Sequence, residues 1–139
     1  MPKPVMWRVL MSLIGAWHAH GFAMFSVFER STGRWVGRLG PWMPEGWPGT
    51  EIGWTISRDC WGRGYATEGA IAATDWAVDT LGWTDIIHSI APENVASQQV
   101  ARKLGSRNRG PGKLPAPLQD SVIDIWGQTA DEWRVRRNR

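Results

Sequence analysis

The chain has 139 residues and a formal net charge of +3, with 42% hydrophobic and 21% charged residues. This length fits one domain, residues 1–139, and the composition excludes a disordered tail. The single cysteine, Cys60, excludes an intrachain disulfide and a cysteine-based zinc site, so we expect a cytoplasmic protein without a metal. The basic patches are too small to indicate a nucleic-acid partner, and the apolar run at residues 9–17 is too short to span a membrane.

The first part of the chain predicts a helix followed by strands. Within residues 9–17 apolar side chains recur at helical spacing, which predicts an amphipathic helix packed on a sheet. Runs of apolar and β-branched residues predict three strands, at residues 22–28, 35–39 and 51–57. The segment between the second and third strands, residues 40–50, is rich in Gly and Pro and is predicted to be a loop.

The second part of the chain alternates helices and strands. Residues 65–81 carry alanines along one side and acids along another, which predicts an amphipathic helix that Gly82 closes. The remaining predicted elements are a strand at 85–91, a helix capped by Asn94 and ending at Gly105, a loop at 110–117, a strand at 122–126 and a polar helix from Ala130 onward. This order predicts an α/β fold, a mixed sheet flanked by helices.

The most informative stretch joins the third predicted strand to the long helix. Gly62 and Gly64 tolerate a positive φ, so successive backbone N–H groups can point into one concavity at the positive end of the helix. Such a nest binds phosphate, and Arg63 can add a charged contact. A Gly-x-Gly turn also occurs without any ligand. The P-loop pattern is absent, and Thr67 stands where a dinucleotide fingerprint requires a third Gly or Ala.

Three motifs, in this order, resemble the GNAT superfamily of acyl-CoA-dependent N-acyltransferases. They are Glu51-Ile-Gly-Trp, Trp61-Gly-Arg-Gly-Tyr-Ala-Thr-Glu68, and Asn94-Val-Ala-Ser97 running to Lys103-Leu-Gly105. The resemblance covers residues 22–133 and is closest to the ribosomal-protein-alanine N-acetyltransferase (RimJ/RimL) type. It implies a mixed, mostly antiparallel sheet whose splayed central strands hold the pantetheine arm of acetyl-CoA. Met1 falls where the second helix of the family begins, so we expect a shortened domain without the first strand and first helix.

The resemblance also implies which residues bind acetyl-CoA. A strand edge would hold the pantetheine, the glycine loop would hold the pyrophosphate, and the second motif helix would contribute its first turn. These twelve residues are Trp54, Thr55, Ile56, Trp61, Gly62, Arg63, Gly64, Tyr65, Ala66, Thr67, Asn94 and Ser97. The basic run at residues 102–113 either meets the 3′-phosphate of CoA or forms a solvated face.

Acyl transfer to an amine needs a base for the amine and a proton for the departing thiolate. Glu51 is the first candidate for the base, acting through a water as strand carboxylates of the family often do; the alternative is a solvated strand-end residue. His88 is the rival base, although its place on a strand favours a buried, hydrogen-bonded histidine. Ser97 either donates to the thiolate or caps the helix, and nothing near Cys60 in the sequence activates it as a nucleophile.

These features predict an N-acetyltransferase that moves an acetyl group from acetyl-CoA to a primary amine by direct attack in a ternary complex. The acceptor is either a protein N-terminus or a small molecule. The alternatives are a CoA-binding module without turnover and, more remotely, a nucleotide-binding α/β domain. A sheet without its first strand exposes an unpaired edge, so we also expect a homodimer.

Overall fold

The computed structural model describes residues 1–139 as four α-helices, a short 3₁₀ turn (Arg58–Cys60) and six strands. The helices are α1 (Lys3–His20), α2 (Tyr65–Asp79), α3 (Val95–Leu104) and α4 (Ala130–Arg137). The strands are β1 (Phe25–Phe28), β2 (Trp35–Trp42), β3 (Glu51–Ile56), β4 (Asp85–Ile90), β5 (Arg107–Gly112) and β6 (Ile123–Thr129). None of the helices has the length and apolar character needed to cross a membrane.

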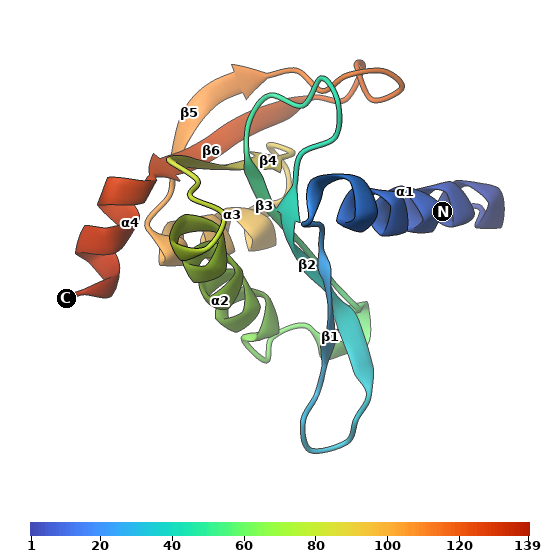
Figure 1. Ribbon diagram of the computed structural model, residues 1–139, viewed down its shortest axis with the longest axis horizontal. Helices are drawn as coiled ribbons and strands as arrows, with labels where there is room; N and C mark the ends of the chain where they lie inside the picture. The colour runs from blue at the N-terminus through green and yellow to red at the C-terminus, as the bar shows by residue number, and fades with distance from the viewer.

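The six strands form one sheet in the order β1-β2-β3-β4-β6-β5. Every neighbouring pair is antiparallel except β3 and β4, which run parallel and share a single residue pair, Glu51 with Ile87. Parallel strands require a crossover connection, and α2 provides it. In Figure 1, α2 and α3 lie together on one side of the sheet. This arrangement confirms the predicted mixed, mostly antiparallel sheet with splayed central strands.

Small residues let α2 lie close to the sheet. A side chain at Gly69 would meet the side chain of Leu39 in β2 at 2.3 Å, so only glycine permits this approach. The buried alanines of the same helix face are Ala70, Ala73 and Ala77. The predicted helix is confirmed but ends two residues early, at Asp79, and Gly82 adopts a positive φ of 71° in the turn that follows.

Two loop predictions were wrong in part, and Gly and Pro explain both. Strand β5 extends through Gly112 into the first three residues of the segment predicted as a loop at 110–117, and β2 continues through Pro41 to Trp42 into the segment predicted as a loop at 40–50. β5 is an edge strand whose pairing with β6 shifts register between Asn108 and Pro111. Gly and Pro occur in edge strands and bulges as well as in loops, so their presence alone does not distinguish these structures.

The N-terminal helix forms as predicted, but only the part near its C-terminal end packs on the sheet. No residue of α1 is buried, and Figure 1 shows the helix extending away from the rest of the molecule. Only its C-terminal end is anchored: Nε1 of Trp17 donates to the carbonyl oxygen of Met24 at 3.1 Å, and the ring of Trp17 packs edge-on against Phe25. The apolar residues before this anchor therefore remain largely exposed.

Candidate active site

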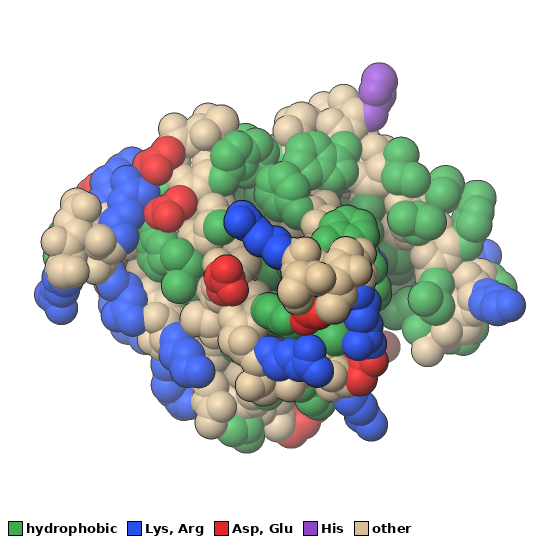
Figure 2. Space-filling view, turned by 90° about the horizontal axis from the view of Figure 1, so that it is seen from below, with side chains coloured by type: hydrophobic (Ala, Val, Ile, Leu, Met, Phe, Trp, Pro, Cys, Tyr) green, Lys and Arg blue, Asp and Glu red, His purple; other side chains and the backbone are tan.

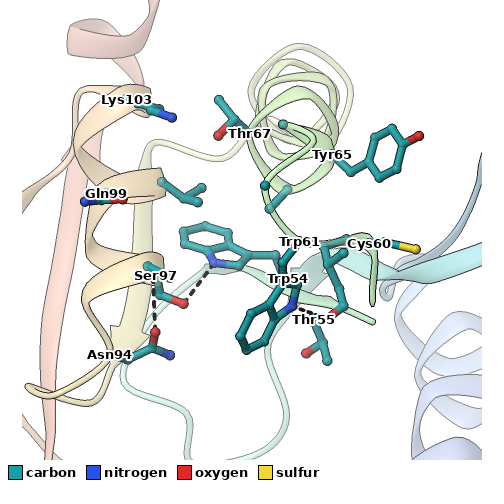
Figure 3. A pocket seen from close by; sticks show the side chains of 16 residues that line it. Trp54, Thr55, Cys60, Trp61, Tyr65, Thr67, Asn94, Ser97, Gln99 and Lys103 are labelled. Carbon is teal, nitrogen blue, oxygen red and sulfur yellow. Dashed lines mark hydrogen bonds between the residues drawn. The ribbon is translucent and has the colours of Figure 1, made fainter. Parts of the chain in front are cut away.

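A cleft of about 420 Å³ lies where the C-terminal half of β3 faces the first turns of α2 and α3 (Figure 3). Its walls come from all three segments that carry the sequence motifs. Eleven of the twelve residues that the resemblance implied for acetyl-CoA line this cleft, and the exception is Arg63. The fold thus brings residues of β3, the glycine loop and α3 together around one hollow.

The glycine loop presents a row of free backbone donors at the mouth of α2. Gly62 and Gly64 have φ values of 77° and 79°, as the sequence predicts for a nest. The first backbone hydrogen bond of the helix runs from the N–H of Glu68 to the carbonyl of Gly64. None of the six N–H groups from Gly62 to Thr67 donates to an acceptor in the protein. These donors and the helix dipole give the loop the chemistry that suits an anion such as a pyrophosphate.

Beyond Glu51, β3 and β4 separate, and one edge of β3 has backbone groups without a partner strand. The N–H of Ser57 donates to the carbonyl of Val36 in β2. Because backbone groups alternate in direction along a strand, the N–H and C=O groups of the even-numbered residues of β3 point away from β2. Of these, the carbonyl of Ile56 accepts a bond from Nε1 of Trp61 at 2.7 Å. The N–H and C=O of Trp54 are left facing the gap, where an extended ligand can pair with them as an added strand does.

Two titratable side chains end the β3–β4 ladder. If β3 and β4 stayed paired, the carbonyl of Ile52 would accept a hydrogen bond from β4. It accepts instead from Nδ1 of His88 at 2.8 Å. The N–H of Ser89 donates to Oε2 of Glu51 at 2.7 Å. Both side chains thus satisfy backbone groups that the splay would otherwise leave unpaired, which stabilises the open geometry.

Glu51 is a buried carboxyl group, so the alternative of a solvated strand-end residue was wrong. It is 6% exposed, and its Oε1 accepts from Nε1 of Trp47 at 2.8 Å. Burial raises the pKa of Glu51 from 4.5 to about 7, against the lowering effect of the hydrogen bonds from Ser89 and Trp47. Glu51 does not line the cleft, and a side chain at Gly53 would stand 3.9 Å from both its Cγ and its Oε2. Its carboxyl group therefore lies beside Gly53 at the splay.

His88 is the buried, hydrogen-bonded histidine that its position in a strand favoured. A carbonyl oxygen can only accept, so Nδ1 carries the proton toward Ile52, and Nε2 accepts from Oγ of Ser106 at 2.8 Å. Oγ of Ser106 in turn accepts from Nε2 of Gln128 at 3.0 Å. Burial lowers the pKa of His88 to about 4, so the imidazole is neutral at physiological pH and both its nitrogens are already bonded.

Ser97 keeps its hydroxyl free of the helix cap. The cap is formed by Oδ1 of Asn94, which accepts from the backbone N–H of Ser97 at 3.1 Å. Oγ of Ser97 instead accepts from Nε1 of Trp54 at 3.2 Å across the cleft, as the dashed lines in Figure 3 show. Because the indole only donates, the hydroxyl proton of Ser97 remains available to an acceptor in the cleft.

Arg63 points away from the predicted phosphate site. Its Nη1 lies 3.3 Å from Oε2 of Glu29, at the end of the β1–β2 hairpin. The hydroxyl of Tyr65 donates to the same carboxylate oxygen, and this bond raises the pKa of Tyr65. Glu29 thus holds the side chains of Arg63 and Tyr65, while the backbone N–H groups of the glycine loop remain unpaired.

Only one residue of the basic run at 102–113 lines the cleft, and that residue is Lys103 on α3. The arginines of the run have partners elsewhere: Arg102 stacks on Trp126, Arg107 pairs with Glu132, and Arg109 pairs with Asp85. Lys103 is therefore the one cation of this run placed to meet a phosphate in the cleft.

Sequence patterns gave no signal for several residues of this region. Trp47 lies in a Gly/Pro-rich loop without periodicity, yet its indole bonds Glu51. Ala96, Gln99 and Val100 line the cleft because they lie on the face of α3 that carries Ser97 and Lys103. Helical spacing predicts these positions once that face is known.

The sequence matches a family model described as an acetyltransferase (GNAT) domain, over residues 5–107. The chain belongs to the GNAT acetyltransferase family. It is 35% identical over 85 residues to the uncharacterized N-acetyltransferase YnaD of Bacillus subtilis (strain 168), a match covering 60% of this chain and 50% of the relative. The chain spans about half the length of the curated relatives it matches.

Solved GNAT structures share the fold. An acetyltransferase from Agrobacterium tumefaciens superposes with a TM-score of 0.79 at 29% identity, covering 92% of this chain and 72% of that one. A putative ribosomal-protein-serine acetyltransferase from Vibrio cholerae gives 0.73 at 21% identity, covering 88% and 72%. An aminoglycoside acetyltransferase in complex with coenzyme A and kanamycin gives 0.64 at 19% identity, covering 76% and 66%. The last two show the fold alone, and they represent different acceptor types on that fold.

Proposed function

We propose that this protein is an acetyl-CoA-dependent N-acetyltransferase that acetylates a primary amine by direct attack in a ternary complex. One observation carries the proposal: the free N–H groups of residues 62–67 and the open peptide edge of Trp54 line the same cleft, beside the splay. Family membership supports acetyl transfer in general. The motifs favour a relative of the RimJ/RimL type, and the single cysteine favours the cytoplasm. The acceptor is either a protein N-terminus or a small-molecule amine.

The described residues fit the two chemical parts of acetyl-CoA. The nest at residues 62–67 suits a pyrophosphate, Lys103 suits a further phosphate, and the edge of Trp54 suits the amide groups of pantetheine. When bound, acetyl-CoA supplies an acetyl group activated as a thioester. The protein's part is to hold that thioester at the splay and to exclude water from it.

Glu51 and Ser97 are the residues we propose for proton transfer. The amine nitrogen attacks the thioester carbonyl carbon, the C–S bond breaks, and the amine proton passes to the carboxylate of Glu51, directly or through a water. A pKa of about 7 suits this role, because the group is substantially ionised at neutral pH and is still basic. The free hydroxyl proton of Ser97 is available to the departing thiolate.

Ligand-induced stabilisation tests the cofactor assignment. Acetyl-CoA or CoA should raise the Tm of the protein, because a ligand that binds only the native state stabilises it. Gly64→Val should abolish this shift, since a branched residue strains a φ of 79° and therefore disturbs the backbone N–H groups of the nest. Gly82→Val is the matched control: it has a similar φ of 71° and open space around it, but it lies after the far end of α2.

The outcomes separate the three candidate functions. A shift with CoA together with release of thiol in the presence of amines supports the acetyltransferase. A shift without turnover for any amine indicates a CoA-binding module. No shift with CoA but a shift with NAD or ATP overturns the proposal in favour of a nucleotide-binding domain.

We also infer that two copies of the chain associate. The outer edge of β1 is unpaired, and the neighbouring helix α1 exposes large apolar side chains, among them Trp7 at 62%. Exposed edges and large apolar patches both favour association. The mass in solution, measured by light scattering over a range of concentrations, tests this inference.

A further inference from the structure

A second hollow, of about 540 Å³, lies between α1 and the β1–β2 hairpin. Seven of its nine lining residues are hydrophobic, and the two polar ones are Ser26 and Arg38. In Figure 2 hydrophobic side chains gather on the right of the molecule, where α1 lies in Figure 1. Leu39 meets Gly69 of α2, so Arg38, its neighbour in β2, points to the opposite face of the sheet from the acetyl-CoA cleft.

Arg38 is the only charged residue in this groove, and it has no partner. It forms no ion pair and no hydrogen bond with any side chain, and its Nε is buried without an acceptor. Leaving a guanidinium nitrogen buried and unpaired costs stability, so such groups normally have an acceptor. An anionic group on a ligand in the groove would pair with the guanidinium of Arg38, most effectively a carboxylate, which binds guanidinium in a bidentate way.

The groove adjoins Glu51 through Met24 and Gly53. Met24 lines the groove, and its terminal methyl lies 2.9 Å from the point where a Cβ on Gly53 would stand. Oε2 of Glu51 lies 3.9 Å from the same point. At Gly53, which has no side chain, the flexible end of Met24 therefore separates the groove from Glu51.

The positions of Arg38 and Glu51 set the size of a ligand that engages both. Arg38 pairs with Thr55, four residues along β3 from Glu51, so the two backbone positions lie roughly 13 Å apart. The side chains of both residues shorten this span. A peptide of two or three residues, at roughly 3.3–3.6 Å each, has a length of the order of the remaining span.

We propose that this groove selects the acceptor: a short apolar peptide whose carboxylate binds Arg38 and whose free amino terminus reaches Glu51. This inference rests on the proposed acetyltransferase function. The apolar walls contact the side chains of the peptide, and Arg38 binds its C-terminal carboxylate, the end that is not acetylated. Glu51 then accepts the proton of the attacking amine at the other end.

Three peptides separate the contributions of the groove. A leucine tripeptide with a free carboxylate should be acetylated best; its C-terminal amide lacks the group for Arg38, and a serine tripeptide lacks the apolar side chains. KM for the leucine tripeptide should be about 10- to 100-fold lower than KM for its amide. Arg38→Met should remove this difference without changing the Tm shift with CoA. Arg30→Met, in the exposed β1–β2 turn, should leave it intact.

A binding assay distinguishes failure of this inference from failure of the proposed function. The apolar dye anilinonaphthalene sulfonate, in the presence of saturating CoA, should be displaced by the leucine tripeptide from the unmodified protein but not from Arg38→Met. Displacement of the dye without acetylation of any amine retains the groove and overturns the acetyltransferase. Acetylation of amines with no preference among the three peptides overturns the groove and retains the acetyltransferase. No displacement from the unmodified protein also overturns the groove.

Discussion

Replacing Glu51 with glutamine changes stability in a way that depends on pH. Because burial raises the pKa of Glu51 from 4.5 to about 7, the native state binds this proton more tightly than the unfolded chain does. The contribution of Glu51 to stability is therefore greatest below pH 4.5 and falls as the pH rises to about 7, where it levels off. The shift corresponds to a loss of about 3 kcal/mol across this window. Glu51→Gln removes this dependence.

The amide introduces a cost of its own at every pH. Trp47 and Ser89 both donate to the carboxyl group of Glu51, each to a different oxygen. Glutamine has one carbonyl oxygen, so one of these two donors loses its acceptor at a cost of roughly 1–3 kcal/mol. Glu51→Gln should thus be less stable than the unmodified protein at pH 4.5, and the deficit should shrink or reverse by pH 8.

Urea unfolding at pH 4.5 and pH 8, followed by the fluorescence of the eleven tryptophans, measures this change directly. The difference in unfolding free energy between the two proteins should move by about 3 kcal/mol in favour of the variant between the two pH values. An equal difference at both pH values would show that Glu51 does not titrate with a raised pKa, and the reasoning from burial would fail.

The same variant tests the proposed role in proton transfer. The turnover of Glu51→Gln should fall by roughly 10²–10⁴-fold with little change in CoA affinity, as for the loss of a general base. The rise in rate through pH about 7 should disappear with it. Full turnover by the variant, with that limb intact, would assign the limb to the amine itself and leave Glu51 with only its structural bonds.

Three further substitutions test other parts of the site and surface. His88→Ala should destabilise the protein by roughly 2–4 kcal/mol at pH 7 and by less at pH 5. The reason is that the pKa of His88 is lowered to about 4 in the native state, so below about pH 6.5 the unfolded chain binds a proton that the native protein does not. A destabilisation that grows toward pH 5 would contradict this. Ser97→Ala should lower turnover less than Glu51→Gln does and change the thermal shift with CoA only a little; a shift that vanishes would make binding the main role of Ser97. Trp7→Lys should shift the mass measured by light scattering from dimer toward monomer, and an unchanged dimer would place the interface elsewhere.

Local sequence was sufficient wherever one short segment carries the whole feature. Gly62 and Gly64 stand between a strand pattern and a helix pattern, and the structure gives both a positive φ at the start of α2. The cap at Asn94 likewise depends only on residues three positions apart. Backbone conformation at such sites is decided by neighbours along the chain, so residue type and spacing predict it.

Segments distant in the chain decided the rest. Glu51 owes its raised pKa to burial, which the hydrogen bond from Ser89 opposes, and no spacing within β3 records either the burial or this partner 38 residues later. Arg38 is one of many arginines in the sequence, and only the placement of α1 beside the β1–β2 hairpin leaves it alone in an apolar groove. The local pattern thus determined which segments form helices, turns and caps, while burial and the pairing of charges were decided by tertiary packing, because solvent exclusion depends on every element that surrounds a group.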